Sequence, residues 1–109
     1  MSRGARAGIA ALAHADRLIH EPARMTIMAV LASRRSADFV TLVRITGLTK
    51  GNLSAHAIKL EEAGYVSVDK SFRGRTPHTL YALTPGGRRA FQAYRVKLRR
   101  LLDGNDRSG

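Results

Sequence analysis

The chain lacks several features that would point to particular kinds of chemistry. Its 109 residues include no cysteine, which excludes disulfides, thiolate metal sites and thiol nucleophiles together. No apolar run approaches the ~20 residues of a membrane-spanning helix. Residues 1–20 carry charged side chains through and after a short apolar run, so no signal peptide is expected. These absences predict a single-domain cytoplasmic protein with no membrane association.

Acidic residues are also scarce. Eight Asp and Glu stand against nineteen Lys and Arg, which gives a formal net charge of +11. Residues 70–100 hold basic side chains throughout and no acidic one, whereas a solvated surface normally mixes both signs. Such an excess on a small domain indicates an acidic partner, most often nucleic acid.

No group of residues has the spacing of a catalytic or metal site. The histidines at 14, 20, 56 and 78 do not follow metal-ligand spacing. The segment "PGGRR", residues 85–89, lacks the strand and the Lys-Ser/Thr pair of a phosphate-binding loop. We therefore expect neither an enzyme nor a bound cofactor or metal, and the sequence identifies no small-molecule effector.

Apolar periodicity predicts three helices in the first two thirds of the chain. The first runs from about Pro22 to Ser33, with proline in its first turn. A short helix over 40–46 ends at Gly47, and a third follows within "GLTKGNLSAHAIKLEEAGYV". Thr49 or Asn52 is its N-cap, since both side chains suit that position.

After Gly64 the period changes from 3.6 to 2. Residues 65–72 and 78–83 are expected to form a hairpin, with Pro77 ending the basic loop between them. Thr84 then caps a last helix that runs to about Leu102. The expected core comprises Met25–Leu31, Leu42, Ile45, Leu53, Leu60, Val66, Val68, Tyr81 and Leu83.

This order predicts a mainly α fold with a small β-hairpin (α+β), a winged helix-turn-helix. The second helix of such a pair enters the DNA major groove, so its leading residues should be short and polar. A basic hairpin tip would reach the adjacent backbone or minor groove. The candidate recognition-helix contacts are Thr49, Lys50, Gly51, Asn52, Ser54, Ala55 and Lys59. The candidate wing contacts are Lys70, Arg73, Gly74, Arg75 and Thr76.

The segment "GLTKGNLSAHAIKLEEAGYVSVDKSFRGRTPHTLYALTPGGRRAF" resembles the small winged helix-turn-helix transcriptional regulators of the MarR and ArsR types. With "IHEPARMTIMAVL" upstream, the similarity covers roughly residues 19–95. The resemblance implies a dimeric, non-enzymatic DNA-binding regulator, with residues 50–59 as recognition helix and 72–77 as wing. Relatives usually have leucine and then a polar residue after the histidine. Here Ala57 and Ile58 stand there, which leaves the packing of Ile58 open.

A further apolar stripe predicts the dimer interface. The last helix carries it at 3-4-3 spacing, as in a coiled-coil seam, and the expected core is complete without it. The predicted interface, formed by the N- and C-terminal helices, comprises Leu12, Leu18, Phe91, Tyr94, Leu98 and Leu101. The expected organisation is a flexible basic arm over 1–13, the DNA-binding domain over 14–87, a dimerisation helix over 88–102 and a disordered tail over 103–109.

These observations predict a regulator, a repressor of transcription, that binds a pseudo-palindromic operator in double-stranded DNA as a homodimer. The alternative is a winged-helix module that binds protein or RNA and recognises no operator. Both would be basic, but only the first requires paired recognition helices.

Overall fold

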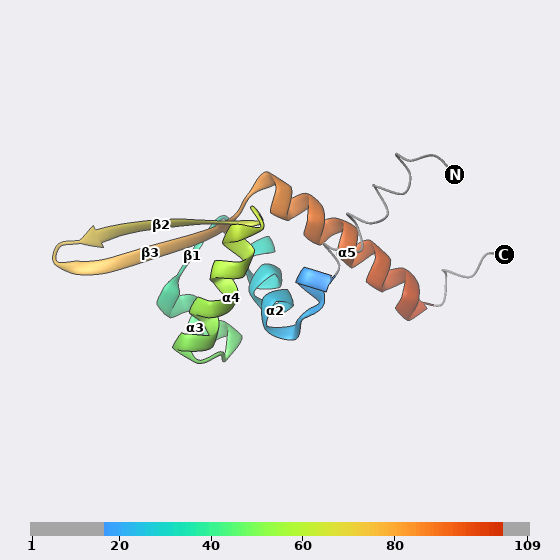
Figure 1. Ribbon diagram of the computed structural model, residues 1–109, viewed down its shortest axis with the longest axis horizontal. Coiled ribbons are helices and arrows are strands. Elements are labelled where there is room, and N and C mark those ends of the chain that lie inside the picture. The colour runs from blue at the N-terminus through green and yellow to red at the C-terminus, as the bar shows by residue number, and fades with distance from the viewer. Residues whose placement is uncertain (1–16, 104–109) are drawn as a thin grey trace.

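The computed structural model describes residues 17–103. Its β-hairpin and its last helix extend in opposite directions from a core of shorter helices (Figure 1). Residues 17–20 form one helical turn before the first full helix. The elements are α2 (Pro22–Ala32), β1 (Ala37–Asp38), α3 (Phe39–Thr46), α4 (Lys50–Glu62), β2 (Val66–Arg73), β3 (Thr76–Leu83) and α5 (Pro85–Asp103).

The helix boundaries follow local capping. The Glu21 carboxylate accepts from the Arg24 backbone N–H at 2.9 Å and so caps α2, whose first residue is Pro22. At the end of α4, Gly64 has a φ of 80° and its N–H bonds the Glu61 carbonyl. The Tyr65 N–H bonds the Leu60 carbonyl, which completes a Schellman motif. The predicted helices are therefore confirmed to within one or two residues.

The sheet has three antiparallel strands in the order β1-β3-β2. The β2–β3 register runs from Val66 opposite Leu83 to Arg73 opposite Thr76. The two-residue strand β1 pairs with residues 80 and 81 of β3 and was not predicted. The expectation that Pro77 ends the loop is wrong. Pro77 lies inside β3, beyond the reach of β1, where a strand tolerates a residue without an N–H.

The core packs helices α2, α3 and α4 against the base of the hairpin and the start of α5. Its fully buried side chains are aliphatic or methionine, as the low aromatic content requires: Ile19, Ile27, Met28, Leu31, Leu42, Leu53 and Leu60. Val66, Tyr81 and Leu83 add the inner face of the sheet. The expectation that Ile45 joins this core is wrong, because it is 41% exposed on α3.

A close backbone approach fixes where α5 leaves the sheet. The Thr84 hydroxyl caps α5 by accepting from the Gly87 N–H at 2.9 Å, as the sequence predicted. A Cβ on Gly87 would lie 2.0 Å from the Tyr65 carbonyl oxygen. The same carbonyl accepts from the Thr84 N–H at 3.0 Å. Only glycine at position 87 lets the first turn of α5 lie this close to the start of the hairpin.

Candidate nucleic-acid interface

The turn between α3 and α4 sets the direction of the candidate recognition helix. Gly47 ends α3 with a φ of 74°, and its N–H bonds the Val43 carbonyl. Thr49 then caps α4, because its Oγ1 accepts from the Asn52 N–H at 3.1 Å. This decides between the two caps that the sequence left open. The Asn52 side chain is not used by the cap and has no hydrogen-bond partner within residues 17–103.

The two faces of α4 differ sharply. Leu53, Ala57 and Leu60 are buried against the core. The predicted contact residues lie on the remaining surface: Thr49, Lys50, Gly51, Asn52, Ala55 and Lys59 are exposed, and Ser54 is half-buried. A Cβ added to Gly51 would meet no atom of the described chain within 4 Å. The fold itself therefore does not require glycine at position 51.

The hairpin carries the second group of predicted residues well away from the core (Figure 1). Gly74 has a φ of 63° and makes the tight turn between β2 and β3. The predicted wing residues Lys70, Arg73, Gly74, Arg75 and Thr76 are all exposed. Phe72, beside Arg73, is 71% exposed and was not singled out as a contact residue.

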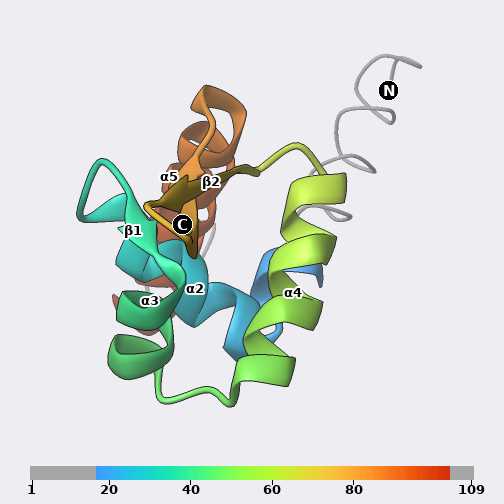
Figure 2. The same cartoon turned by 90° about the vertical axis from the view of Figure 1, so that its left-hand side faces the viewer.

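The structure brings α4 and the hairpin together along one groove. A cavity of about 270 Å³ lies between them, and it is lined by Ser54 and Ile58 of α4 and by Lys70 of β2. Viewed along the hairpin, α4 runs beside it while α3 lies on the other side (Figure 2). Of the predicted contact residues, Ser54 and Lys70 line this groove, whereas the leading turn of α4 and the hairpin tip lie outside it.

The basic side chains of this surface form no ion pairs within the described chain, although Glu61, Glu62 and Asp69 are exposed on the same two elements. Within residues 17–103 no carboxylate forms an ion pair with a lysine of α4 or an arginine of the hairpin tip. Two acidic groups lie beside histidines instead: Glu21 is 3.5 Å from His56, and Asp38 is 3.5 Å from His78. The positive charges are therefore available to an external anion.

His56 holds the inner side of α4 to the start of α2. Its Nδ1 lies 3.3 Å from the Arg24 guanidinium and 3.5 Å from the Glu21 carboxylate. Partial burial raises the pKa of Glu21, but bonds from the Arg24 and Ala23 backbone and the nearby charges outweigh it and lower the pKa overall. The sequence predicted a packed or hydrogen-bonded His56, and the contact with Arg24 confirms this.

The predicted dimer stripe divides into two parts. The expectation that it is left over from the core is wrong for Phe91 and Tyr94, which are only 7% and 6% exposed and belong to the core cluster. They are buried because the first half of α5 packs against α2 and β3 before the helix extends away from the core. Leu98 is partly buried and Leu101 is 54% exposed. Sequence reasoning omitted Leu102, which is 77% exposed.

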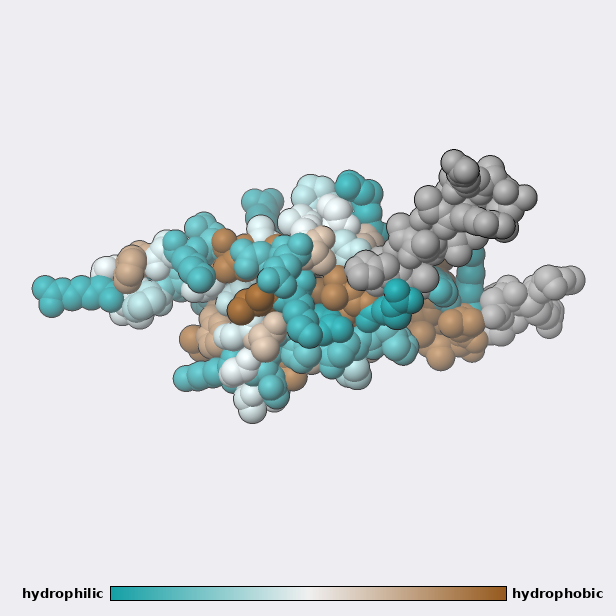
Figure 3. All heavy atoms as spheres, viewed as in Figure 1, coloured by the Kyte–Doolittle hydropathy of each residue, from teal (hydrophilic) through white to brown (hydrophobic). Residues whose placement is uncertain are grey.

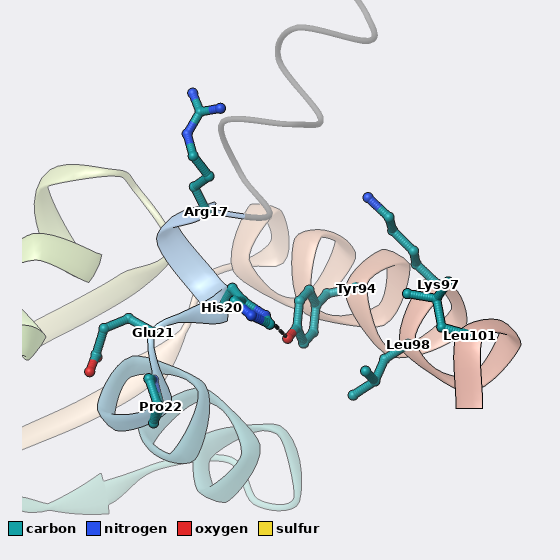
Figure 4. A pocket seen from close by; sticks show the side chains of 8 residues that line it. All are labelled: Arg17, His20, Glu21, Pro22, Tyr94, Lys97, Leu98 and Leu101. Atoms are coloured by element: carbon teal, nitrogen blue, oxygen red, sulfur yellow. Dashed lines mark hydrogen bonds between the residues drawn. The ribbon is translucent and has the colours of Figure 1, made fainter.

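Of the two N-terminal residues predicted in the interface, Leu18 is half-buried and Leu12 lies outside the described residues. Beside Leu18, the turn over 17–20 and the end of α5 enclose a largely apolar cavity of about 610 Å³. The His20 ring bonds the Tyr94 hydroxyl at 2.8 Å across it (Figure 4). This cavity opens next to Leu98 and Leu101.

Residues 17–103 contain neither a membrane-spanning helix nor a cluster of metal ligands. No helix among them is long and apolar enough to cross a bilayer. No three His, Asp or Glu side chains of residues 17–103 group as metal ligands, and His14 lies outside that range.

A three-helix core with a tight turn before an exposed polar helix, followed by a basic hairpin, defines a winged helix-turn-helix. Residues 23–102 match the winged helix DNA-binding domain family, and the chain belongs to that family. The family is one of DNA-binding proteins, so the prediction that the chain is not an enzyme is confirmed.

Individual relatives agree with this assignment. A transcriptional regulator homologue from Pyrococcus horikoshii OT3 is 32% identical, with a TM-score of 0.76 over 84% of this chain and 90% of that one. The uncharacterized protein MJ0432 of Methanocaldococcus jannaschii is 35% identical over 78% of this chain and 92% of its own. A MarR-family regulator from Silicibacter pomeroyi shares the fold, with 20% identity, a TM-score of 0.63 and coverage of 89% and 67%.

Proposed function

We propose that this chain is a homodimeric transcriptional repressor that recognises a pseudo-palindromic operator in double-stranded DNA. The observation that carries the proposal is the leading turn of α4. Thr49 satisfies the backbone there, so the Asn52 side chain is free to pair with a base edge. Asparagine bonds adenine through two atoms at once, and the neighbouring Lys50 suits guanine acceptors or phosphate.

Gly51 supports the same interpretation. Glycine inside a helix costs about 0.5–1 kcal/mol relative to alanine. Nothing in the described chain requires it, because the space beside its Cα is open. A bare backbone at this point would let phosphate or a base edge approach the helix N-terminus, whose free N–H groups favour an anion.

The basic hairpin tip would supply affinity rather than sequence preference. Arg73 and Arg75 are exposed on a projecting turn, where they would neutralise phosphates and release counterions. Repression needs no further surface, because a bound dimer blocks the DNA that it covers. Such a protein acts where the chromosome is, so we place it in the cytoplasm.

The experiment is a selection of bound sequences from a random DNA pool with the full chain. We expect two related half-sites about one helical turn, ~34 Å, apart. Asn52→Ala should lower the ratio of specific to non-specific affinity by ~1–3 kcal/mol. Arg75→Ala is the matched control, and it should weaken all sequences alike and reduce the salt dependence.

Two results would count against the proposal. An equal loss on selected and random DNA for Asn52→Ala would show that this residue does not read bases. A monomeric chain that enriches no sequence would favour the alternative, a winged-helix module that binds protein or RNA.

A further inference from the structure

One residue of α4 does not fit a solvated helix face. Ile58 is 53% exposed, although Leu53, Ala57 and Leu60 already provide the buried side of this helix. Its exposed neighbours along the helix are small or charged, with Ala55 one turn earlier, Lys59 next to it and Glu61 and Glu62 one turn later. A large β-branched apolar side chain is thus half accessible on the outward side of the candidate recognition helix.

The surroundings of Ile58 place it between the two candidate contact regions. It lines the groove of about 270 Å³ together with Ser54, one turn nearer the start of α4, and Lys70 on the hairpin. Phe39, Val68 and Tyr81 form part of the groove wall. Ile58 therefore lies between this apolar wall and polar groups of the groove, which include Ser54 and Lys70 but also the carboxylate of Glu61.

Its position along the helix sets what it would meet. Ile58 follows Lys50 by eight residues, which is ~12 Å along the axis at 1.5 Å per residue. This distance is comparable to the major-groove width of ~12 Å. With the start of α4 inside the groove, Ile58 would still face base edges a few steps from those that Asn52 meets.

DNA offers one apolar group on those edges, the C5-methyl group of thymine. We propose that Ile58 is a specificity-determining residue that contacts a thymine methyl in the major groove. This inference rests on the proposed function of α4 as the recognition helix. The proposed partner is DNA rather than a second protein, because Ile58 shares the exposed face of α4 with the candidate contact residues. The nearby Lys59 and Lys70 also form no ion pair within the described chain, although Glu61 lines the same groove.

The test removes the methyl group from the DNA and the side chain from the protein, separately and together. In the site selected by the full chain, each thymine is replaced in turn by deoxyuridine, which lacks only that methyl. Affinities are measured for the unaltered protein, for Ile58→Ala, and for Ile45→Ala as a matched control with an exposed isoleucine on α3. Thermal unfolding of each variant verifies that it folds.

We expect deoxyuridine at one thymine of each half-site to weaken the unaltered protein and Ile45→Ala about three- to fivefold, the value of one buried methyl group. The same replacement should leave Ile58→Ala unchanged. Ile58→Val, which keeps a branched side chain and folds with less disturbance, should show an intermediate response.

Other outcomes separate this inference from the proposed function. One such outcome is that deoxyuridine weakens binding of the unaltered protein and of both variants by the same factor, and another is that it changes none of the three affinities. Either result would overturn the role of Ile58 and leave operator recognition intact. If Ile58 only supports the wing, Ile58→Ala would weaken thymine and deoxyuridine sites by the same factor, which also overturns it. Failure to enrich any sequence would refute sequence-specific binding itself.

Discussion

Two glycines that occupy helices in this chain have opposite surroundings. A Cβ at Gly51 would enter open space, whereas a Cβ at Gly87 would lie 2.0 Å from the Tyr65 carbonyl oxygen. The first glycine is explained by what α4 is proposed to bind. The second is explained by the fold, since it lets α5 begin directly against the chain that enters the hairpin.

Gly87→Ala is expected to destabilise the protein by ~1–3 kcal/mol or more, since the clashing atom belongs to the backbone and a methyl group cannot be accommodated without moving α5. Gly86→Ala is the matched control, because its added Cβ would make ordinary contacts at 3.7 Å and beyond. It should be neutral or stabilising by up to ~1 kcal/mol. Urea unfolding at one protein concentration measures both, and equal stabilities would contradict the packing role of Gly87.

The structural roles of some single residues could be predicted from the sequence, and those of others could not. It placed Gly47 and Gly64 correctly, because helix C-terminal glycines with positive φ follow a strong local rule. It left Thr49 and Asn52 as alternative caps, since both have a short side-chain oxygen acceptor, and the structure shows that Thr49 forms the bond. Gly87 went unnoticed because its constraint comes from Tyr65, far away in sequence.

At the scale of elements, Asp38 joins three parts of the fold. It ends the short strand β1 and its carboxylate caps α3 by accepting from the Thr41 N–H at 2.7 Å. It also lies 3.5 Å from the His78 ring on β3. Hydrogen bonding from Thr41 is the main reason that the pKa of Asp38 lies below its ordinary value of 3.8, with His78 adding to the effect.

This depressed pKa predicts a dependence of stability on pH. A carboxyl group with a lower pKa in the folded state stabilises the fold above its ordinary pKa, and the contribution is lost as pH falls through the lower native value. The unaltered protein should therefore be more stable than Asp38→Asn near neutral pH, and the difference should shrink below about pH 4.

Thermal unfolding between pH 3 and 7 tests this expectation. Asp69→Asn is the control, because Asp69 is exposed on β2 and does not cap a helix. A difference between Asp38→Asn and the unaltered protein that stays constant across this range would contradict the assignment.

Elements with a strong local signal were predictable, and those decided by tertiary packing were not. The hydrophobic period, the capping residues and the turn residues predict the helices and the hairpin. Strand β1 has only two residues and exists because β3 offers it an edge, so no sequence pattern marks it. The stripe on α5 has the spacing of a seam, but spacing does not say which partner covers it, and Phe91 and Tyr94 turned out to pack within the chain.

At the scale of the whole molecule, the hairpin and the end of α5 differ in apolar surface, although both carry exposed arginines. The hairpin tip is hydrophilic, whereas the end of α5 shows a hydrophobic surface (Figure 3). Leu101 and Leu102 there are 54% and 77% exposed. Contiguous apolar surface on a small domain is typical of an interaction site, so we propose the end of α5 as the dimer interface. A second copy joined at this end would leave both hairpins and both α4 helices facing outward.

Leu101→Arg is therefore expected to convert a dimer of the 11.9 kDa chain into a monomer in light scattering, since it places a charge in the apolar contact. The variant should also lose affinity for a full operator while binding a single half-site as before. Val40→Arg is the matched control, because Val40 is 71% exposed on α3, away from this end, and should leave the mass unchanged. If the unaltered protein has the mass of one chain, the dimer is contradicted. Binding of two half-sites by a two-fold pair of α4 helices would then be contradicted as well.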